Sequence, residues 1–67
     1  MKELTKQVKQ AAEKLNVLLE QLISDRVDYY DDKSERWQDG DAGQAYYDAT
    51  GELEDFNTTL YDFIEEL

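Results

Sequence analysis

The strongest constraint on the fold is a heptad pattern of apolar residues that covers both halves of the chain. The chain contains no proline, and its three glycines all lie between residues 40 and 51. In the first half, apolar residues recur at steps of three and four residues, at Leu4, Val8, Ala11, Leu15, Leu18 and Leu22. This spacing places them along one side of an α-helix that packs against another helix.

After Leu22 the pattern moves by one position. The shifted pattern overlaps the first one: it begins at Leu19 and continues through Ile23, Val27, Tyr30, Ser34 and Trp37. Such a shift resembles a stutter, which changes the local supercoil without ending the helix. We therefore expect one helix over residues 2–38, about 55 Å long at ~1.5 Å per residue. The alternative is three helices with a break near residues 30–33, because Asp32 followed by Glu35 resembles a capping box.

The second half of the chain repeats the heptad pattern after a short gap. Its apolar positions are Tyr46, Ala49, Leu53, Phe56, Leu60, Phe63 and Leu67. They predict a second helix over residues 43–66, with a turn at residues 39–43. Gly40 suits the left-handed residue that ends a helix, and Asp41 with Gln44 suits a capped start. The sequence therefore predicts an all-α antiparallel two-helix hairpin as a single domain over residues 1–67.

The unequal lengths of the two helices predict self-association. Leu67 is expected beside Glu13 or Lys14, which leaves the beginning of the first helix uncovered. A chain of 67 residues also has a marginal core, which rarely supplies more than about 3–5 kcal/mol. We expect a homodimer that forms a four-helix bundle. The self-association surface is predicted at Leu4, Val8, Ala11 and Leu15. In the alternative, this overhang docks on another protein.

The composition excludes much chemistry. With neither cysteine nor histidine, the chain lacks the common nucleophile–base pairs, disulfides and the preferred ligands of zinc. A calcium loop starting at Asp39 fails because Gly43, Gln44 and Thr50 stand where an acid, glycine and glutamate are required. We therefore expect no enzyme, metal or cofactor. No apolar run approaches the ~20 residues that span a bilayer, and no secretion signal is recognisable. A cytoplasmic protein is expected.

The charge of the chain favours a basic protein as the partner. The sequence carries 17 acids and 7 bases, for a net charge of −10. Residues 1–14 have a net charge of +2, and residues 15–67 have a net charge of −12. Such a surface repels nucleic acids and anionic membranes and attracts basic protein surfaces. We therefore expect neither nucleic acid nor membrane to bind directly.

The acids follow a helical order. The first predicted helix carries a column of Asp25, Asp28, Asp32, Glu35 and Asp39, and the second carries Asp48, Glu52, Asp55 and Asp62. Neighbours in such a column lie about 5–6 Å apart, which is comparable to the phosphate spacing along a nucleic-acid strand. Like charges at this spacing weaken a helix, so stability does not select them. The columns predict a nucleic-acid mimic. In the alternative, they are a solvated face that keeps an acidic protein soluble.

The aromatic residues divide into two sets. Tyr30, Trp37, Tyr46, Phe56 and Phe63 lie on the heptad positions and are predicted to be core residues. Trp37 and Tyr46 flank the turn and are expected to pack against each other. Tyr29, Tyr47 and Tyr61 lie off the heptad positions. Exposed tyrosines make good contact residues for a partner, and they would equally suit a dimer interface.

The region around the turn resembles short acidic proteins of bacteria, phages and plasmids that have no known activity. The matching positions are Ser34, Glu35, Arg36, Trp37, Gln38, Gly43, Ala45, Tyr46, Leu53 and Glu54. The resemblance implies a helical hairpin and an origin in a phage or mobile element. The leading functional hypothesis is an inhibitor that binds a basic nucleic-acid-handling protein, such as a defence nuclease. The alternative is a structural or adaptor module that acts through helix–helix self-assembly.

Overall fold

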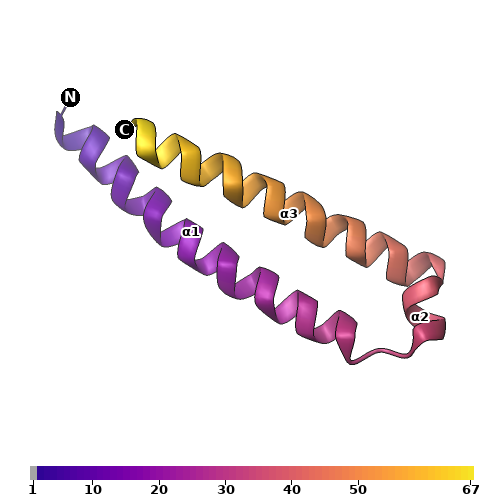
Figure 1. The fold of residues 1–67 in the computed structure, drawn as a ribbon. Coiled ribbons are helices and arrows are strands. Elements are labelled where there is room, and N and C mark those ends of the chain that lie inside the picture. The colour runs from indigo at the N-terminus through magenta and orange to yellow at the C-terminus, as the bar shows by residue number, and fades with distance from the viewer. Residues whose placement is uncertain (1) are drawn as a thin grey trace.

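The protein is an antiparallel helical hairpin. The computed structural model describes residues 2–67. It contains α1 (Lys2–Asp31), α2 (Glu35–Asp39) and α3 (Asp41–Glu66). The two long helices lie side by side, with α2 at one end of the rod and both termini at the other (Figure 1). The rod measures 52 × 15 × 13 Å. The predicted all-α antiparallel hairpin is therefore confirmed.

The first helix ends at Asp31, so a continuous helix over residues 2–38 was wrong and the three-helix alternative is correct. Ser34 is extended, and its Oγ accepts a hydrogen bond of 3.3 Å from the backbone N–H of Trp37. A hydroxyl in this position satisfies one of the free N–H groups in the first turn of a helix. Ser34 therefore starts α2, where the sequence pattern had pointed to Asp32.

Gln38 explains why the chain tolerates this break. Its side-chain amide donates to the backbone carbonyl oxygens of Tyr30 at 2.8 Å and Lys33 at 3.2 Å. The end of a helix leaves carbonyl groups without helical partners, and half-buried groups of this kind are costly if unpaired. The Tyr30 carbonyl also accepts from the Lys33 N–H at 3.1 Å, so one amide on α2 adds a second partner there and supplies a partner for the Lys33 carbonyl.

The connection between α2 and α3 is tighter than predicted. Gly40 is extended, with φ −78° and ψ 173°, so it is not a left-handed residue. Its N–H donates to the Trp37 carbonyl at 3.2 Å, and its own carbonyl accepts from the Gln44 N–H at 3.0 Å. Asp41 is already the first residue of α3, so Gly40, not Asp41, occupies the N-cap position. A single extended residue joins the two helices and leaves no room for the predicted turn over residues 39–43.

Gly43 allows this tight connection. A Cβ atom at position 43 would fall on the carbonyl oxygen of Trp37 and would lie 2.7 Å from both the Cα and the carbonyl oxygen of Gln38. Gly43 is buried. The backbone of α2 therefore packs directly on the first turn of α3, at a distance that only glycine permits.

The contact between α1 and α3 uses a stripe of residues that the apolar pattern selected only in part. We call these buried and half-buried residues the contact stripe. It comprises Ala12, Asn16, Leu19, Ile23, Arg26 and Tyr30 on α1, and Gly43, Tyr46, Thr50, Leu53, Asn57, Leu60 and Ile64 on α3. Leu19, Ile23, Tyr30, Tyr46, Leu53 and Leu60 lie on the predicted pattern, whereas the polar members do not. The buried hydrophobic residues among residues 2–67 are Ala12, Leu19 and Ile64, each 8–9% exposed. The core of a single hairpin is therefore thin.

Two polar links fix the register of the hairpin. The Asn16 side-chain amide donates to Oδ1 of Asn57 at 2.7 Å, and Arg26 Nε donates to Oγ1 of Thr50 at 2.9 Å. Counting equal numbers of residues from the Asn16–Asn57 pair places Leu67 opposite about residue 6. Leu67 therefore does not lie beside residues 13–14. The overhang is shorter than predicted because α1 ends early and α2 folds back over the end of the rod.

We expect the Asn16–Asn57 pair to behave as a coupled unit. Asn16→Leu alone should lower the free energy of unfolding by about 1–2 kcal/mol, because the Asn57 amide loses its partner inside the contact stripe. Adding Asn57→Leu should restore most of that loss, because the remaining polar group is then removed as well. Urea unfolding of the wild type, both single variants and the double variant at one protein concentration measures the coupling. Single effects that simply add would contradict it.

Candidate functional site

An aromatic cluster closes the α2 end of the rod. Its members are Tyr29, Tyr30, Trp37, Tyr46 and Tyr47. The Trp37 ring lies 5.9 Å from Tyr46, which confirms their predicted packing, and 6.1 Å from both Tyr29 and Tyr30. Two further contacts join α1 to α3: Tyr29–Tyr46 at 5.2 Å and Tyr30–Tyr47 at 5.6 Å. Tyr29 and Tyr47, predicted to contact a partner, thus already have ring partners within the chain.

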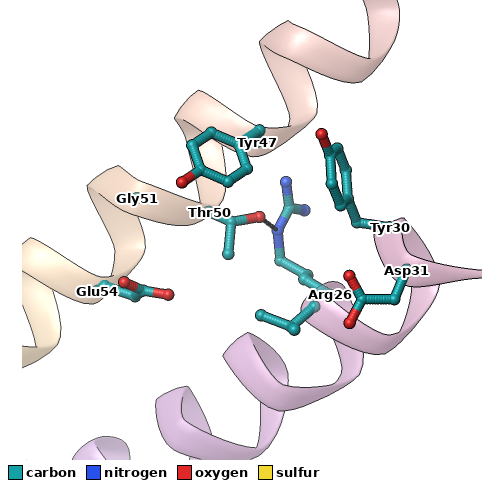
Figure 2. Close-up of a pocket in the computed structure, with 8 residues that line it drawn as sticks. Arg26, Tyr30, Asp31, Tyr47, Thr50, Gly51 and Glu54 are labelled. Atoms are coloured by element: carbon teal, nitrogen blue, oxygen red, sulfur yellow. Dashed lines mark hydrogen bonds between the residues drawn. The ribbon is translucent and has the colours of Figure 1, made fainter. Parts of the chain in front are cut away.

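A pocket of about 180 Å³ lies beside this cluster. Figure 2 shows Arg26 reaching from α1 toward Thr50 on α3, between Tyr30 and Tyr47. Its Nε donates to Thr50 Oγ1 at 2.9 Å, and a terminal nitrogen donates to the Tyr46 carbonyl at 3.3 Å. The guanidinium also lies 4.0 Å from the centre of the Tyr46 ring. Arg26 thus joins the helices through hydrogen bonds and a cation–π contact, which is a structural role.

The outer surface of α3 carries a line of acids, in which Thr59 takes the position between Asp55 and Asp62. We call Asp48, Glu52, Asp55 and Asp62 the α3 ridge; all four are exposed. At about 100° per residue, they lie on the side of α3 away from Thr50 and Asn57, which face α1. Residues 41–66 contain eight acids and no lysine or arginine. The predicted column on the second helix therefore lies along one continuous helix, and no base within α3 neutralises it.

The column predicted on the first helix is divided. Asp25 and Asp28 are exposed on α1, Asp32 lies in the connection, and Glu35 and Asp39 lie on α2. The prediction required a continuous helix through residues 30–33, which the structure does not have. These five acids surround the α2 end of the rod and do not form a line. The α3 ridge is thus the longer ordered acidic surface.

Tyr61 lies beside the acids at the C-terminal end of α3. Its phenol hydrogen-bonds the Glu65 carboxylate, and this bond together with the negative charge of Glu65 raises the pKa of Tyr61 above its usual range. Tyr47 and Tyr61 are both exposed, and they are fourteen residues apart on the same side of α3. Both remain accessible to a partner that would approach this side of the helix.

A second surface is apolar. We define the apolar face as Leu4, Val8, Leu15, Leu18 and Leu22 on α1 with Phe56, Phe63 and Leu67 on α3, which are 38–60% exposed. Ala11, predicted with them for self-association, is exposed as well. The leucines were predicted to contact the second helix, and Phe56 and Phe63 to be core residues. In the single hairpin, they face solvent because the contact stripe occupies the neighbouring positions.

Both helices present the apolar face on the same side of the hairpin. Positions seven residues apart return to nearly the same side of a helix, so Val8, Leu15 and Leu22 lie on the side of α1 that Tyr29 marks. By the same spacing, Leu67 lies on the side of α3 that Tyr46 marks. Since the rings of Tyr29 and Tyr46 are 5.2 Å apart, these two sides border one surface.

The described residues offer neither a metal site nor a membrane-spanning helix. Within residues 2–67, no cluster of three or more potential ligands has an arrangement that would hold a metal ion. Over the same residues, no helix combines the length and apolar character needed to cross a bilayer. The α3 ridge and the apolar face are thus the two surfaces most suited to binding a partner.

Comparison with known proteins adds no relative. Neither the models of protein families, nor the curated proteins, nor the solved structures gave a match to this chain. The similarity of the turn region to acidic phage and plasmid proteins stays a prediction from sequence. Function is therefore inferred from the surfaces of the hairpin itself.

Proposed function

We propose that the chain is a small acidic, non-enzymatic protein that binds the basic surface of a nucleic-acid-handling protein and inhibits it. The observation that carries this proposal is the α3 ridge, a line of exposed carboxylates on a helix without bases. A basic groove that tracks a phosphate backbone would meet negative charges at a comparable spacing along one edge of the rod.

The cost of the ridge supports a role in binding. Like charges three or four residues apart destabilise a helix by about 0.2–0.5 kcal/mol per pair. Asp48, Glu52 and Asp55 follow one another at this spacing with no compensating lysine or arginine on α3. Charge complementarity across an interface speeds encounter and excludes wrong partners. The exposed rings of Tyr47 and Tyr61 add contact area on the side of α3 that adjoins the ridge.

The class of partner follows from the same features. A nucleic-acid mimic competes with nucleic acid for one surface, so the partner is a nuclease or another nucleic-acid-binding protein. The similarity of residues 33–56 to proteins of phages and plasmids favours a host defence enzyme and a cytoplasmic location. Neither nucleic acid nor membrane is a direct partner in this proposal, because the net charge of −10 repels both.

Neutralising the ridge tests the proposal. We expect the combined substitutions Asp48→Asn, Glu52→Gln and Asp55→Asn to weaken capture of partner proteins from a bacterial lysate by about tenfold or more. Excess duplex DNA should displace the captured protein. Raising the salt from about 0.05 M to about 0.3 M should also release it, because screening weakens exposed charge pairs.

The matched control changes the same charge on α1. Glu3→Gln, Glu13→Gln and Glu20→Gln also remove three exposed acids but leave the ridge intact. This variant should capture its partner as the wild type does. Equal capture by the ridge variant and the wild type, or capture that duplex DNA does not reverse, would refute the mimicry.

A second candidate function is a structural or adaptor module that works through helix–helix assembly. The observation that favours it is the apolar face, which no part of the described chain covers. Salt separates the two functions, because a complex held by apolar contacts responds little to ionic strength, whereas a complex held by the ridge weakens steeply. The two surfaces are distinct, so one protein can use both.

A further inference from the structure

The single hairpin exposes more surface than a folded protein of its size. A monomeric protein of 7.9 kDa has a solvent-accessible surface of about 4,400 Å². The hairpin has 5448 Å², an excess of about 1,000 Å². A standard protein–protein interface buries about 800 Å² on each partner. The excess area is therefore of the size that one further interface would cover.

The excess includes a surface built like the inside of a helical bundle. The apolar face combines five aliphatic side chains of α1 with two phenylalanines and a leucine of α3, all at heptad positions. On each helix it lies directly beside the contact stripe. An apolar stripe this wide is typical of a helix that contacts two neighbouring helices in a bundle. Within the described chain, each long helix has only one such neighbour.

We propose that the apolar face binds a second copy of this chain in antiparallel orientation, so that two hairpins form a four-helix bundle. A second copy fits because a two-fold axis sets a surface against itself, and this face has the same apolar chemistry over its whole length. The proposal does not rest on the proposed function, because the α3 ridge lies on a different side of α3.

The charges at the two ends of the rod determine the orientation. The α2 end, residues 24–48, carries eight acids and three bases, for a net charge of −5. The end with the termini, residues 2–14 and 58–67, carries four bases and five acids, for a net charge of −1. Parallel copies would place two strongly acidic ends side by side. Antiparallel copies keep the two acidic ends apart and so reduce the repulsion.

The position of the apolar face agrees with this arrangement. The face extends from Leu4 to Leu22 on α1 and from Phe56 to Leu67 on α3, so it covers the part of the rod near the termini. A dimer centred on it leaves both aromatic clusters outside the interface, at opposite ends of a longer particle. Both α3 ridges remain exposed, which would give the particle two acidic binding surfaces.

Sedimentation equilibrium with paired variants tests the dimer. The wild type should sediment at about twice its 7.9 kDa mass at high micromolar concentration. Leu18→Glu should shift it to a monomer, raising the dissociation constant at least about a hundredfold, because each chain would bury a charge in the interface. Val17→Glu is the matched control. Val17 and Leu18 are both 51% exposed in the hairpin, but Val17 lies off the apolar face.

A second pair on α3 guards against misfolding. Phe56→Ser should also dissociate the dimer, whereas Tyr61→Ser, at a residue of nearly equal exposure (53% against 52%), should not. The helical circular dichroism of all four variants should stay close to that of the wild type in concentrated samples. A wild type that remains a monomer, or Val17→Glu and Leu18→Glu variants that dissociate equally, would overturn the proposal.

The orientation is tested by spin labels. The chain has no cysteine, so Gln44→Cys gives one label per chain, on an exposed site near α2 and away from the apolar face. In the antiparallel dimer, about 15 residues of α3 separate each label from the centre of the particle. At ~1.5 Å per residue, the two labels should therefore be on the order of 45 Å apart. In a parallel dimer, the labels would be about 20 Å apart, across two helix layers. The shorter distance would refute the antiparallel arrangement.

Discussion

Gly43→Ala is expected to lower the free energy of unfolding by about 2–3 kcal/mol, although it adds a single methyl group. The new Cβ would fall on the Trp37 carbonyl oxygen and would lie 2.7 Å from the Cα and the carbonyl oxygen of Gln38. These are backbone atoms, so no side-chain rotation relieves the clash. The whole of α2 would have to move away from α3, and the packing of Trp37 on Tyr46 would be lost with it.

Gly51→Ala is the matched control in the same helix. A Cβ at position 51 meets nothing within 4 Å, so alanine is accommodated without strain. Inside a helix, alanine is more stable than glycine by about 0.5–1 kcal/mol, and this variant should gain about that amount. Urea unfolding followed by circular dichroism at one protein concentration compares the two. If both glycines responded alike, the close packing of α2 on α3 would be refuted.

Trp37→Ala is expected to have the other large effect, a loss of about 2–3 kcal/mol. Full truncation of a buried tryptophan costs about 3–5 kcal/mol, and Trp37 is half-buried. Its ring contacts those of Tyr29, Tyr30 and Tyr46, and each aromatic pair adds about 0.5–1.5 kcal/mol beyond area burial. A small domain has about 3–5 kcal/mol in total, so the variant should be partly unfolded at 37 °C.

Trp37→Phe tests whether the cluster needs an aromatic ring at position 37 or specifically the larger indole. Phenylalanine retains an aromatic ring between α1 and α3, and we expect it to lose less than about 1.5 kcal/mol. Trp37 is the only tryptophan in the chain, so circular dichroism, not fluorescence, must be used for both variants. A Trp37→Ala variant that unfolds at the urea concentration of the wild type would show that the cluster contributes nothing to closing the hairpin.

The hairpin and the place of its turn were predictable from sequence, because two heptad patterns flank a segment that contains Gly40 and Gly43. The break in the first helix was only one of two alternatives. The sequence placed Ser34 and Gln38 inside the predicted long helix and gave neither residue a role at a break. The hydroxyl of Ser34 caps α2, and the amide of Gln38 donates to two backbone carbonyls near the end of α1. Those contacts exist only once α2 has folded back, so local sequence rules do not reveal them.

The polar members of the contact stripe were missed, whereas most of its apolar members were on the predicted pattern. A search for apolar periodicity selects Leu15, Leu18 and Leu22, which are exposed in the hairpin, and passes over Asn16 and Arg26. The latter two face α3 because complementary partners, Asn57 and Thr50, stand opposite them. Such a match depends on the register between two helices, which a single helix does not encode. Sequence periodicity thus identified two adjacent stripes on α1 and assigned both to the second helix, although α3 covers only one of them.

The acidic columns fared differently on the two helices. Asp48, Glu52 and Asp55 lie on one continuous helix, so their spacing was sufficient to place them on one side of α3. Asp32 and Asp39 depended on a helix that ends before them. The spacing of residues therefore predicts a shared surface only where one continuous helix carries all of them.

The position of α2 also sets an order of folding. Arg26 and Thr50, close to α2, are separated by 24 residues, whereas Asn16 and Asn57 are separated by 41. Closing the shorter loop costs less chain entropy, so contacts between the two helices should form first beside the aromatic cluster. Contacts nearer the termini should form afterwards. The Asn16–Asn57 hydrogen bond would form late, and it would form only in hairpins whose helices have the native register. The leucines near the N-terminus would then be the last part of α1 to be aligned.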